Sequence, residues 1–240
     1  MKKRIKLIVN VFIIIGALLV GGFYVYTQDY YRAEVDVITV MKNESKYHIK
    51  EINNYTLVES IHSPSKQGLI FYPGGKVEDI AYLPLMEKLS EQGFTCYLVE
   101  MPFHLAIFDT GAASQIIKDN QSITNWTLVG HSLGGASASM VANQLPIDHL
   151  VLLGAYSTTD LSKSKIDVLS IVGSEDLIVN KEKLKSNEVN LPATTQHKEI
   201  IGGNHAYYGN YGEQKGDGKA TLTPFEQQSI TAQYIGELIK

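Results

Sequence analysis

The sequence has a single cysteine, Cys96, among its 240 residues, so an intrachain disulfide is impossible and the fold depends on packing. Beyond residues 2–6, which carry four bases, it also lacks a basic cluster: the other 17 Lys and Arg residues are outnumbered by 25 Asp and Glu residues. An acidic chain without clustered bases does not offer the surface that binds nucleic acid. Because 44% of the residues are hydrophobic, a disordered or fibrous chain is excluded as well.

Charge is absent from residues 7–26, and no acid precedes Asp29. A helix of that length spans about 30 Å, the thickness of the hydrocarbon core of a bilayer. The bases before it favour the cytoplasmic side and place the rest of the chain outside. We therefore expect residues 1–30 to be an uncleaved, single-pass membrane anchor. Secretion after cleavage as a signal peptide is the alternative, although no A-x-A-like site follows the run.

Residues 31–240 are expected to form one domain in which strand patterns alternate with helical patterns. Within 31–62, turn residues separate short β-branched and aromatic runs, which predicts an antiparallel meander with strands at 35–41, 47–52 and 55–58. Later strands are expected at 68–72, 94–99, 126–129, 149–153, 167–172 and 196–201, with helices at 79–91, 112–119, 134–145 and from 224 onward. This order predicts an α/β fold whose mainly parallel central sheet is covered by helices on both faces.

The sharpest motif is Gly130-His131-Ser132-Leu133-Gly134-Gly135, between a predicted strand and a predicted helix. A serine on such a tight turn has a strained backbone and needs small residues two positions before and after it. The turn also directs the Leu133 amide toward an oxyanion formed on a substrate. We predict that Ser132 is a nucleophile; the alternative is a helix-capping serine in a glycine-rich turn.

A serine hydroxyl needs a base, and the base needs an acid that orients it. Asp176 follows the predicted strand 167–172 and is the expected acid, with Glu175 beside it as the competitor. His205 follows the last predicted strand and a Gly-Gly pair, and is the expected base. The order serine, aspartate, histidine is that of the α/β-hydrolase triad.

A second strand end offers the remaining oxyanion donor. Gly74 and Gly75 follow the strand at 68–72, and their amides can closely approach a substrate oxygen. Gly75 is the predicted donor together with Leu133, with Lys76 as the fallback. The predicted substrate-binding residues are Gly74, His104 and Tyr208. For Tyr208, an equally good alternative is that it belongs to an aromatic loop packed on the surface.

With these motifs, residues 66–238 resemble the α/β-hydrolase fold superfamily, and within it a compact bacterial branch related to dienelactone hydrolases and small carboxylesterases. The segments that carry the resemblance are Tyr72-Pro73-Gly74-Gly75-Lys76-Val77, Glu100-Met101-Pro102-Phe103, Gly130-His131-Ser132-Leu133-Gly134-Gly135 and Gly203-Asn204-His205-Ala206. Two departures are a serine where dienelactone hydrolases have cysteine, and Pro73 where many esterases have histidine.

The resemblance implies a triad of Ser132, Asp176 and His205 with no metal and no organic cofactor. The expected function is a serine hydrolase that cleaves carboxylic esters through an acyl-enzyme on the extracytoplasmic side of a membrane. Its expected substrate is a small-molecule or lipid-like ester. The short inserts between the predicted elements leave no room for a large lid, which favours small or surface-presented esters, and attachment to a membrane is compatible with a lipid ester. An acyltransferase or amidase using the same triad, and a catalytically silent binding module, are the alternatives.

Overall fold

The computed structural model describes residues 2–35, 37, 46–61 and 66–239. The chain divides into two compact units, Met1–Tyr30 and Tyr31–Lys240. The first unit holds one helix, α1 (Lys2–Gln28). Its residues Arg4–Gln28 are long and apolar enough to cross a membrane, with a mean hydropathy of 2.4 over 18 residues, and a signal sequence near the amino terminus has the same properties.

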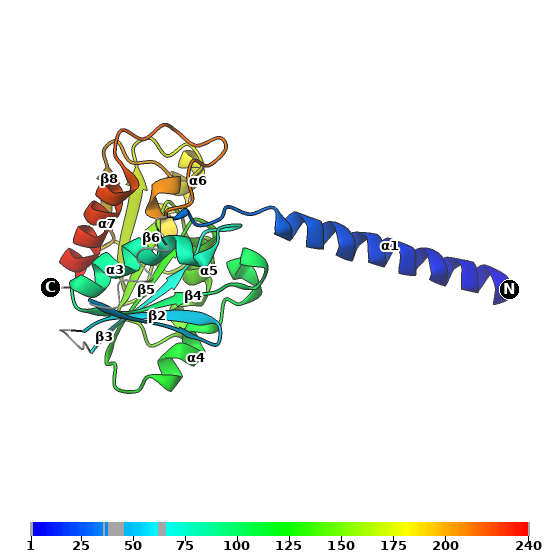
Figure 1. Ribbon diagram of the computed structural model, residues 1–240, viewed down its shortest axis with the longest axis horizontal. Helices are drawn as coiled ribbons and strands as arrows, with labels where there is room; N and C mark the ends of the chain where they lie inside the picture. Colours follow the sequence, from blue (N-terminus) through cyan, green and yellow to red (C-terminus); the bar gives the residue numbers. More distant parts are fainter. Residues whose placement is uncertain (1, 36, 38–45, 62–65, 240) are drawn as a thin grey trace. The chain divides into compact units, whose positions relative to one another are not determined.

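In its described part, the second unit contains an eight-stranded sheet with the order β1-β2-β4-β3-β5-β6-β7-β8 (Figure 1). The strands are β1 (Tyr47–Ile52), β2 (Tyr55–Ser60), β3 (Gln67–Tyr72), β4 (Phe94–Val99), β5 (Asn125–His131), β6 (His149–Leu153), β7 (Asp167–Gly173) and β8 (Gln196–Ile200). β3 pairs in parallel with β4 and β5, and parallel pairing continues through β8. β1, β2 and β4 pair antiparallel, so the predicted, mainly parallel sheet is confirmed.

Helices cover both faces of this sheet, as predicted (Figure 1). They are α3 (Leu83–Glu91), α4 (Ala112–Asp119), α5 (Leu133–Val141) and α7 (Pro224–Leu238), whereas the short α6 (Lys181–Ser186) has no buried residue. Alternation along β3 separates two cores: Leu69 and Phe71 pack with α3 and α7, whereas Ile70 and Tyr72 pack with α4 and α5.

The local sequence explains where two of these helices begin. Thr223 caps α7, because its hydroxyl accepts the Glu226 N–H and the Glu226 carboxylate accepts the Thr223 N–H. The predicted helix 79–91 is instead a 3₁₀ turn, Asp79–Tyr82, followed by α3. Pro84 has no N–H to donate to the turn before it, which explains why the α-helix starts anew at Leu83.

Two other expectations differ from the structure. Of the predicted strand 35–41, only Val35 and Val37 are described, and both have helical backbone; its other residues lie outside the described part of the chain. The predicted helix 134–145 begins at Leu133 and ends at Val141, where a 3₁₀ turn, Ala142–Gln144, leads into Pro146. Proline disfavours helical backbone in the residue before it, and Leu145 accordingly has extended backbone, with φ −113° and ψ 147°.

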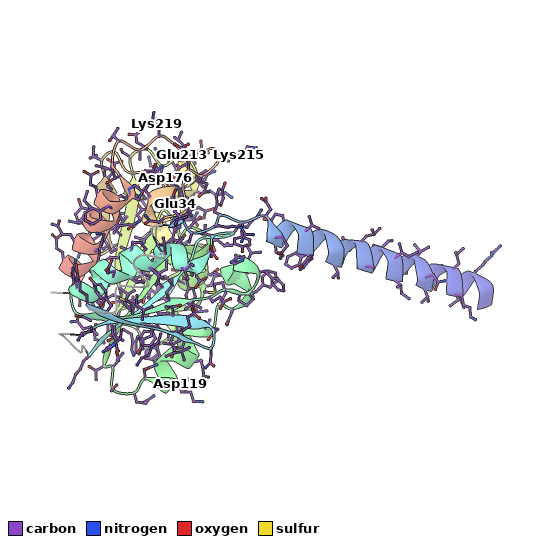
Figure 2. All side chains as sticks on the ribbon, in the orientation of Figure 1. Glu34, Asp119, Asp176, Glu213, Lys215 and Lys219 are labelled. Carbon is purple, nitrogen blue, oxygen red and sulfur yellow. The ribbon has the colours of Figure 1, made fainter. Side chains whose placement is uncertain are left out.

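The strand order reverses at β3, since β4 lies on one side of it and β5 on the other. Ligands of open α/β sheets bind at the carboxyl ends of the strands at such a reversal. Asp176, labelled in Figure 2, lies at this end of the second unit, opposite Asp119 at the end of α4. The fold thus brings the loops after β3, β5, β7 and β8 to one edge of the sheet.

Candidate active site

Ser132 occupies the turn between β5 and α5 with φ 52° and ψ −119°. This is strained backbone for a residue other than glycine, and it persists only where the surroundings enforce it. One constraint is the Ser132 N–H, which donates to the Leu153 carbonyl at the end of β6 at 2.9 Å. The turn therefore holds the serine at the carboxyl edge of the sheet.

Glycines on either side of Ser132 allow this turn. A Cβ atom on Gly130 would lie 2.5 Å from the carbonyl carbon of Gly134, and one on Gly134 would collide with the carbonyl oxygens of Tyr72 and Pro73. No side chain fits at either position without moving backbone. The small residues expected from the motif are therefore required by the close approach of α5 to β3 and β5.

The carboxylate of Asp176 is fully buried in the loop after β7. Its Oδ1 accepts the N–H groups of Ile178 and Val179 at 2.9 and 2.8 Å, and its Oδ2 lies 2.8 Å from Nδ1 of His205. The neighbouring Glu175 instead accepts a hydrogen bond from the Ser174 hydroxyl at 3.0 Å. Of the two acids considered from the sequence, Asp176 is the one brought to the histidine.

The imidazole of His205 is 1% exposed, and its Nδ1–H donates to Asp176. Nε2 of the neutral ring then carries the lone pair, and it has no hydrogen-bond partner among the described residues. His205 and Ser132 line the same cavity of about 330 Å³. The three predicted residues thus converge at one edge of the sheet.

The loop that carries His205 is fixed by α7. Gln227, which is fully buried, accepts the Asn204 N–H with Oε1 at 2.9 Å and donates Nε2–H to the Asn204 carbonyl at 2.7 Å. Asp217 adds a link between two loops, since it accepts the Ala206 N–H at 2.9 Å and the Leu177 N–H at 3.3 Å. These contacts were not foreseen, because no local pattern connects these residues to residues 176 and 205.

Backbone hydrogen bonding separates the two candidates for the second oxyanion donor. The Lys76 N–H donates to the His104 carbonyl at 2.7 Å and is thereby occupied. The Gly75 N–H has no hydrogen-bond partner in the described part of the chain. Leu133 is the first residue of α5, where N–H groups lack partners within the helix. The predicted pair of Gly75 and Leu133 is therefore the one with available donors.

The three predicted substrate-binding residues lie elsewhere than in the Ser132 cavity. Gly74 donates its N–H to the hydroxyl of Tyr82 at 3.1 Å. His104 lines a separate hollow with Asn53 and Glu100, among others. Tyr208 is fully buried, donates to the Ile171 carbonyl at 3.1 Å, and has its pKa raised by that burial.

The cavity beside Ser132 is lined largely by residues that the sequence did not single out. They come from the loops after β6 and β7 and are Gly154, Ala155, Tyr156, Thr158, Ile178, Val179 and Asn180. A larger hollow of about 500 Å³ lies near Gln67 and Gln92, at the amino end of β3. It is remote from Ser132, so the smaller cavity is the candidate site.

Gly154 is the lining residue whose identity matters most. With φ 52°, it packs directly against the acid and the base: a Cβ atom there would lie 2.9 Å from Nδ1 of His205 and 3.0 Å from Oδ2 of Asp176. The only sign of this role in the sequence is that a glycine directly follows a predicted buried strand.

Among the described residues, no three His, Cys, Asp or Glu side chains are grouped as metal ligands.

Comparison with known proteins agrees with the α/β fold described above. Residues 68–229 match the model of the alpha/beta hydrolase family. The sequence itself matches no curated protein.

Several solved structures share the fold at low identity. The esterase domain of a Rhodothermus marinus protein is 14% identical with a TM-score of 0.58, over 80% of this chain and 98% of that one. Carboxylesterase CesB from Bacillus subtilis is 12% identical with a TM-score of 0.59, over 90% and 96%. Dienelactone hydrolase from Anabaena variabilis is 17% identical with a TM-score of 0.56, over 81% and 97%. With the family match spanning more than half of its residues, the chain belongs to the alpha/beta hydrolase family.

Proposed function

We propose that this protein is a serine hydrolase that cleaves carboxylic esters through an acyl-enzyme. The observation that carries the proposal is the buried 2.8 Å contact between Asp176 and His205, which leaves Nε2 of His205 with a free lone pair beside the Ser132 cavity. A base held in one tautomer next to a strained serine is the arrangement that activates a hydroxyl group.

In the first half of the reaction, Oγ of Ser132 attacks the ester carbonyl carbon and its proton passes to Nε2 of His205. The N–H groups of Leu133 and Gly75 stabilise the oxyanion that forms on the carbonyl oxygen. The bond to the alcohol then breaks, and the imidazolium gives its proton to the leaving oxygen. Asp176 stabilises the imidazolium while it exists.

In the second half, a water molecule attacks the acyl carbon while His205 accepts one of its protons. The bond to Oγ of Ser132 breaks, the proton returns to the serine, and the carboxylic acid leaves. Each proton that His205 accepts is released again within the cycle, so no external acid or base is consumed.

The size of the site favours small esters. A cavity of about 330 Å³ lies at the lower end of the range found for ligand pockets, about 300–1,000 Å³. Its lining includes the apolar residues Ala155, Ile178 and Val179 beside Tyr156 and Thr158. We infer a short, apolar acyl or alcohol group, and p-nitrophenyl acetate is the first substrate to test.

The second part of the proposal concerns location. The 25-residue helix Arg4–Gln28 carries its bases at its amino-terminal end, before the uncharged residues 7–26, which favours an anchor that leaves the hydrolase unit outside the cytoplasm. We expect the full chain to sediment with membranes and to resist carbonate extraction. We also expect protease added outside intact cells to cleave it. A soluble protein lacking residues 1–30 in the culture medium would instead establish secretion after cleavage.

The decisive experiment for the chemistry is labelling of the full chain with a fluorescent fluorophosphonate. We expect the wild type to be labelled and Ser132→Ala to be unlabelled and inactive on p-nitrophenyl acetate. Labelling that persists in Ser132→Ala would disprove the assigned nucleophile. A folded wild type that is neither labelled nor active would favour a binding module.

A further inference from the structure

A buried chain of hydrogen bonds joins the loop after β3 to the last residue of β5. The Gly74 N–H donates to Oη of Tyr82 at 3.1 Å, and Oη of Tyr82 lies 2.7 Å from Nδ1 of His131. Tyr82 is 0% exposed and His131 is 1% exposed. None of these contacts involves Ser132, Asp176 or His205, so the chemistry described above does not account for them.

The Tyr82 hydroxyl has two polar partners in this chain, the Gly74 N–H and Nδ1 of His131. The Tyr82 hydroxyl already accepts the Gly74 N–H, so its own hydrogen is available for Nδ1 of His131. Oη of Tyr82 and Nδ1 of His131 share one hydrogen, and Nε2 of His131 has no hydrogen-bond partner among the described residues. Burial, with the nearby His205 as a smaller cause, holds the pKa of His131 well below its usual value, which keeps the ring neutral.

His131 packs against the proposed base, and both His131 and Tyr82 pack against the loop after β3. The ring of His131 lies 4.5 Å from that of His205, centroid to centroid. A Cβ atom on Gly74 would lie 2.7 Å from Nδ1 of His131 and 2.8 Å from Oη of Tyr82. The loop after β3 therefore rests directly on this pair, and the next residue along that loop is Gly75.

We propose that Tyr82 and His131 are positioning residues that set the place of the Gly75 N–H relative to Ser132 and support one side of the His205 ring. The inference rests on the proposed ester hydrolysis. An oxyanion donor acts only within about 2.7–3.1 Å of the oxygen it stabilises, so the residue that fixes Gly74 also controls the effect of Gly75. A neutral His131 also avoids placing a second positive charge beside the imidazolium that forms on His205.

Three variants of the full chain separate positioning from simple packing. Tyr82→Phe keeps the ring and removes only the hydroxyl, so kcat on p-nitrophenyl acetate should fall about 10–100-fold. KM should change less than about threefold, because the lost contact acts on the transition state. His131→Asn retains an acceptor near the position of Nδ1, whereas His131→Leu has none. We expect His131→Asn to keep at least about tenfold more of the wild-type kcat than His131→Leu.

The matched control is Tyr47→Phe. Tyr47 is also a buried tyrosine, and its hydroxyl donates to Oε1 of Glu91 at 2.6 Å, on the outer strand β1. It should lose thermal stability as Tyr82→Phe does but keep the wild-type kcat. Melting temperatures of all variants, with assays run well below the lowest of them, ensure that only folded protein is compared.

The outcomes distinguish a failure of this inference from a failure of the proposed ester hydrolysis. An inactive wild type, or an active Ser132→Ala, would refute the proposed function itself. With an active wild type and an inactive Ser132→Ala, wild-type kcat in folded Tyr82→Phe would overturn the positioning role alone. Equal kcat values for His131→Asn and His131→Leu would overturn the role of the hydrogen bond between Tyr82 and His131.

Discussion

Oδ2 of Asp176 lies 2.8 Å from Nδ1 of His205, and both side chains are buried. The other carboxylate oxygen accepts two backbone N–H groups, so the acid has little freedom to turn. Two loops that follow strands at one edge of the sheet thus form a contact that fixes the tautomer of the imidazole. The arrangement makes the identity of the acid directly testable.

Asp176→Asn should lower kcat about 10⁴-fold, because an amide NH₂ facing Nδ1 favours the wrong tautomer of His205. Steady-state hydrolysis of p-nitrophenyl acetate measures the loss. Glu175→Gln is the matched control one residue away, since Glu175 contacts Ser174 instead of His205. A Glu175→Gln loss as large as that of Asp176→Asn would contradict the assignment of the acid.

Gly154→Ala should reduce kcat strongly, because the added methyl group would meet Nδ1 of His205 at 2.9 Å and Oδ2 of Asp176 at 3.0 Å. The positive φ adds a stability cost of about 1–2 kcal/mol. Gly93→Ala shares the positive-φ strain, with φ 96°, but its Cβ atom would meet nothing within 4 Å. Thermal unfolding should therefore show a loss for both variants, and the kcat assay a loss for Gly154→Ala alone.

Much of this site follows from local sequence. Ser132, Asp176 and His205 each follow a predicted strand, and parallel strands bring their carboxyl ends to one edge, so convergence is predictable without coordinates. The glycines that flank Ser132 likewise predict the strained turn. A strand end does not specify which side chains of its loop line the pocket, so the sequence predicts His104 and Tyr208 there although neither lines the Ser132 cavity.

Contacts between elements far apart in the chain had no such signal. Gln227 in α7 pairs with the backbone of Asn204, and Tyr82 reaches His131 across the sheet edge. An isolated glutamine or tyrosine on a helix has many partners open to it, and only the packed fold selects one. The helix boundary at Leu83 has a different cause: the apolar spacing of residues 79–91 predicts one continuous helix, but the proline at position 84 interrupts it.

Gln227→Met should weaken both stability and turnover, since the Asn204 N–H and carbonyl would lose their buried partner. Each unsatisfied buried group costs about 1–3 kcal/mol, and the displaced loop carries His205. Chemical denaturation measures the first effect and kcat the second. Gln233→Met on the same helix is the control, because Gln233 is exposed and contacts Glu237. Similar losses in the two variants would indicate a general effect on α7.

Asp79 gives a pH-dependent prediction for stability. Burial, with the nearby Glu100 as a smaller cause, raises its pKa from 3.8 to about 7 in the folded protein. The native state thus holds a proton that the unfolded state releases between about pH 4 and 7, so this group makes stability fall as the pH rises through that window. Asp79→Asn has no proton to lose and should melt at a higher temperature than the wild type at pH 8, with the difference vanishing near pH 4.

Asp167→Asn makes the same charge change at an exposed carboxylate and should show no such pH-dependent gain. An Asp79→Asn gain that is equal at both pH values would mean that ionisation of Asp79 is not its cause.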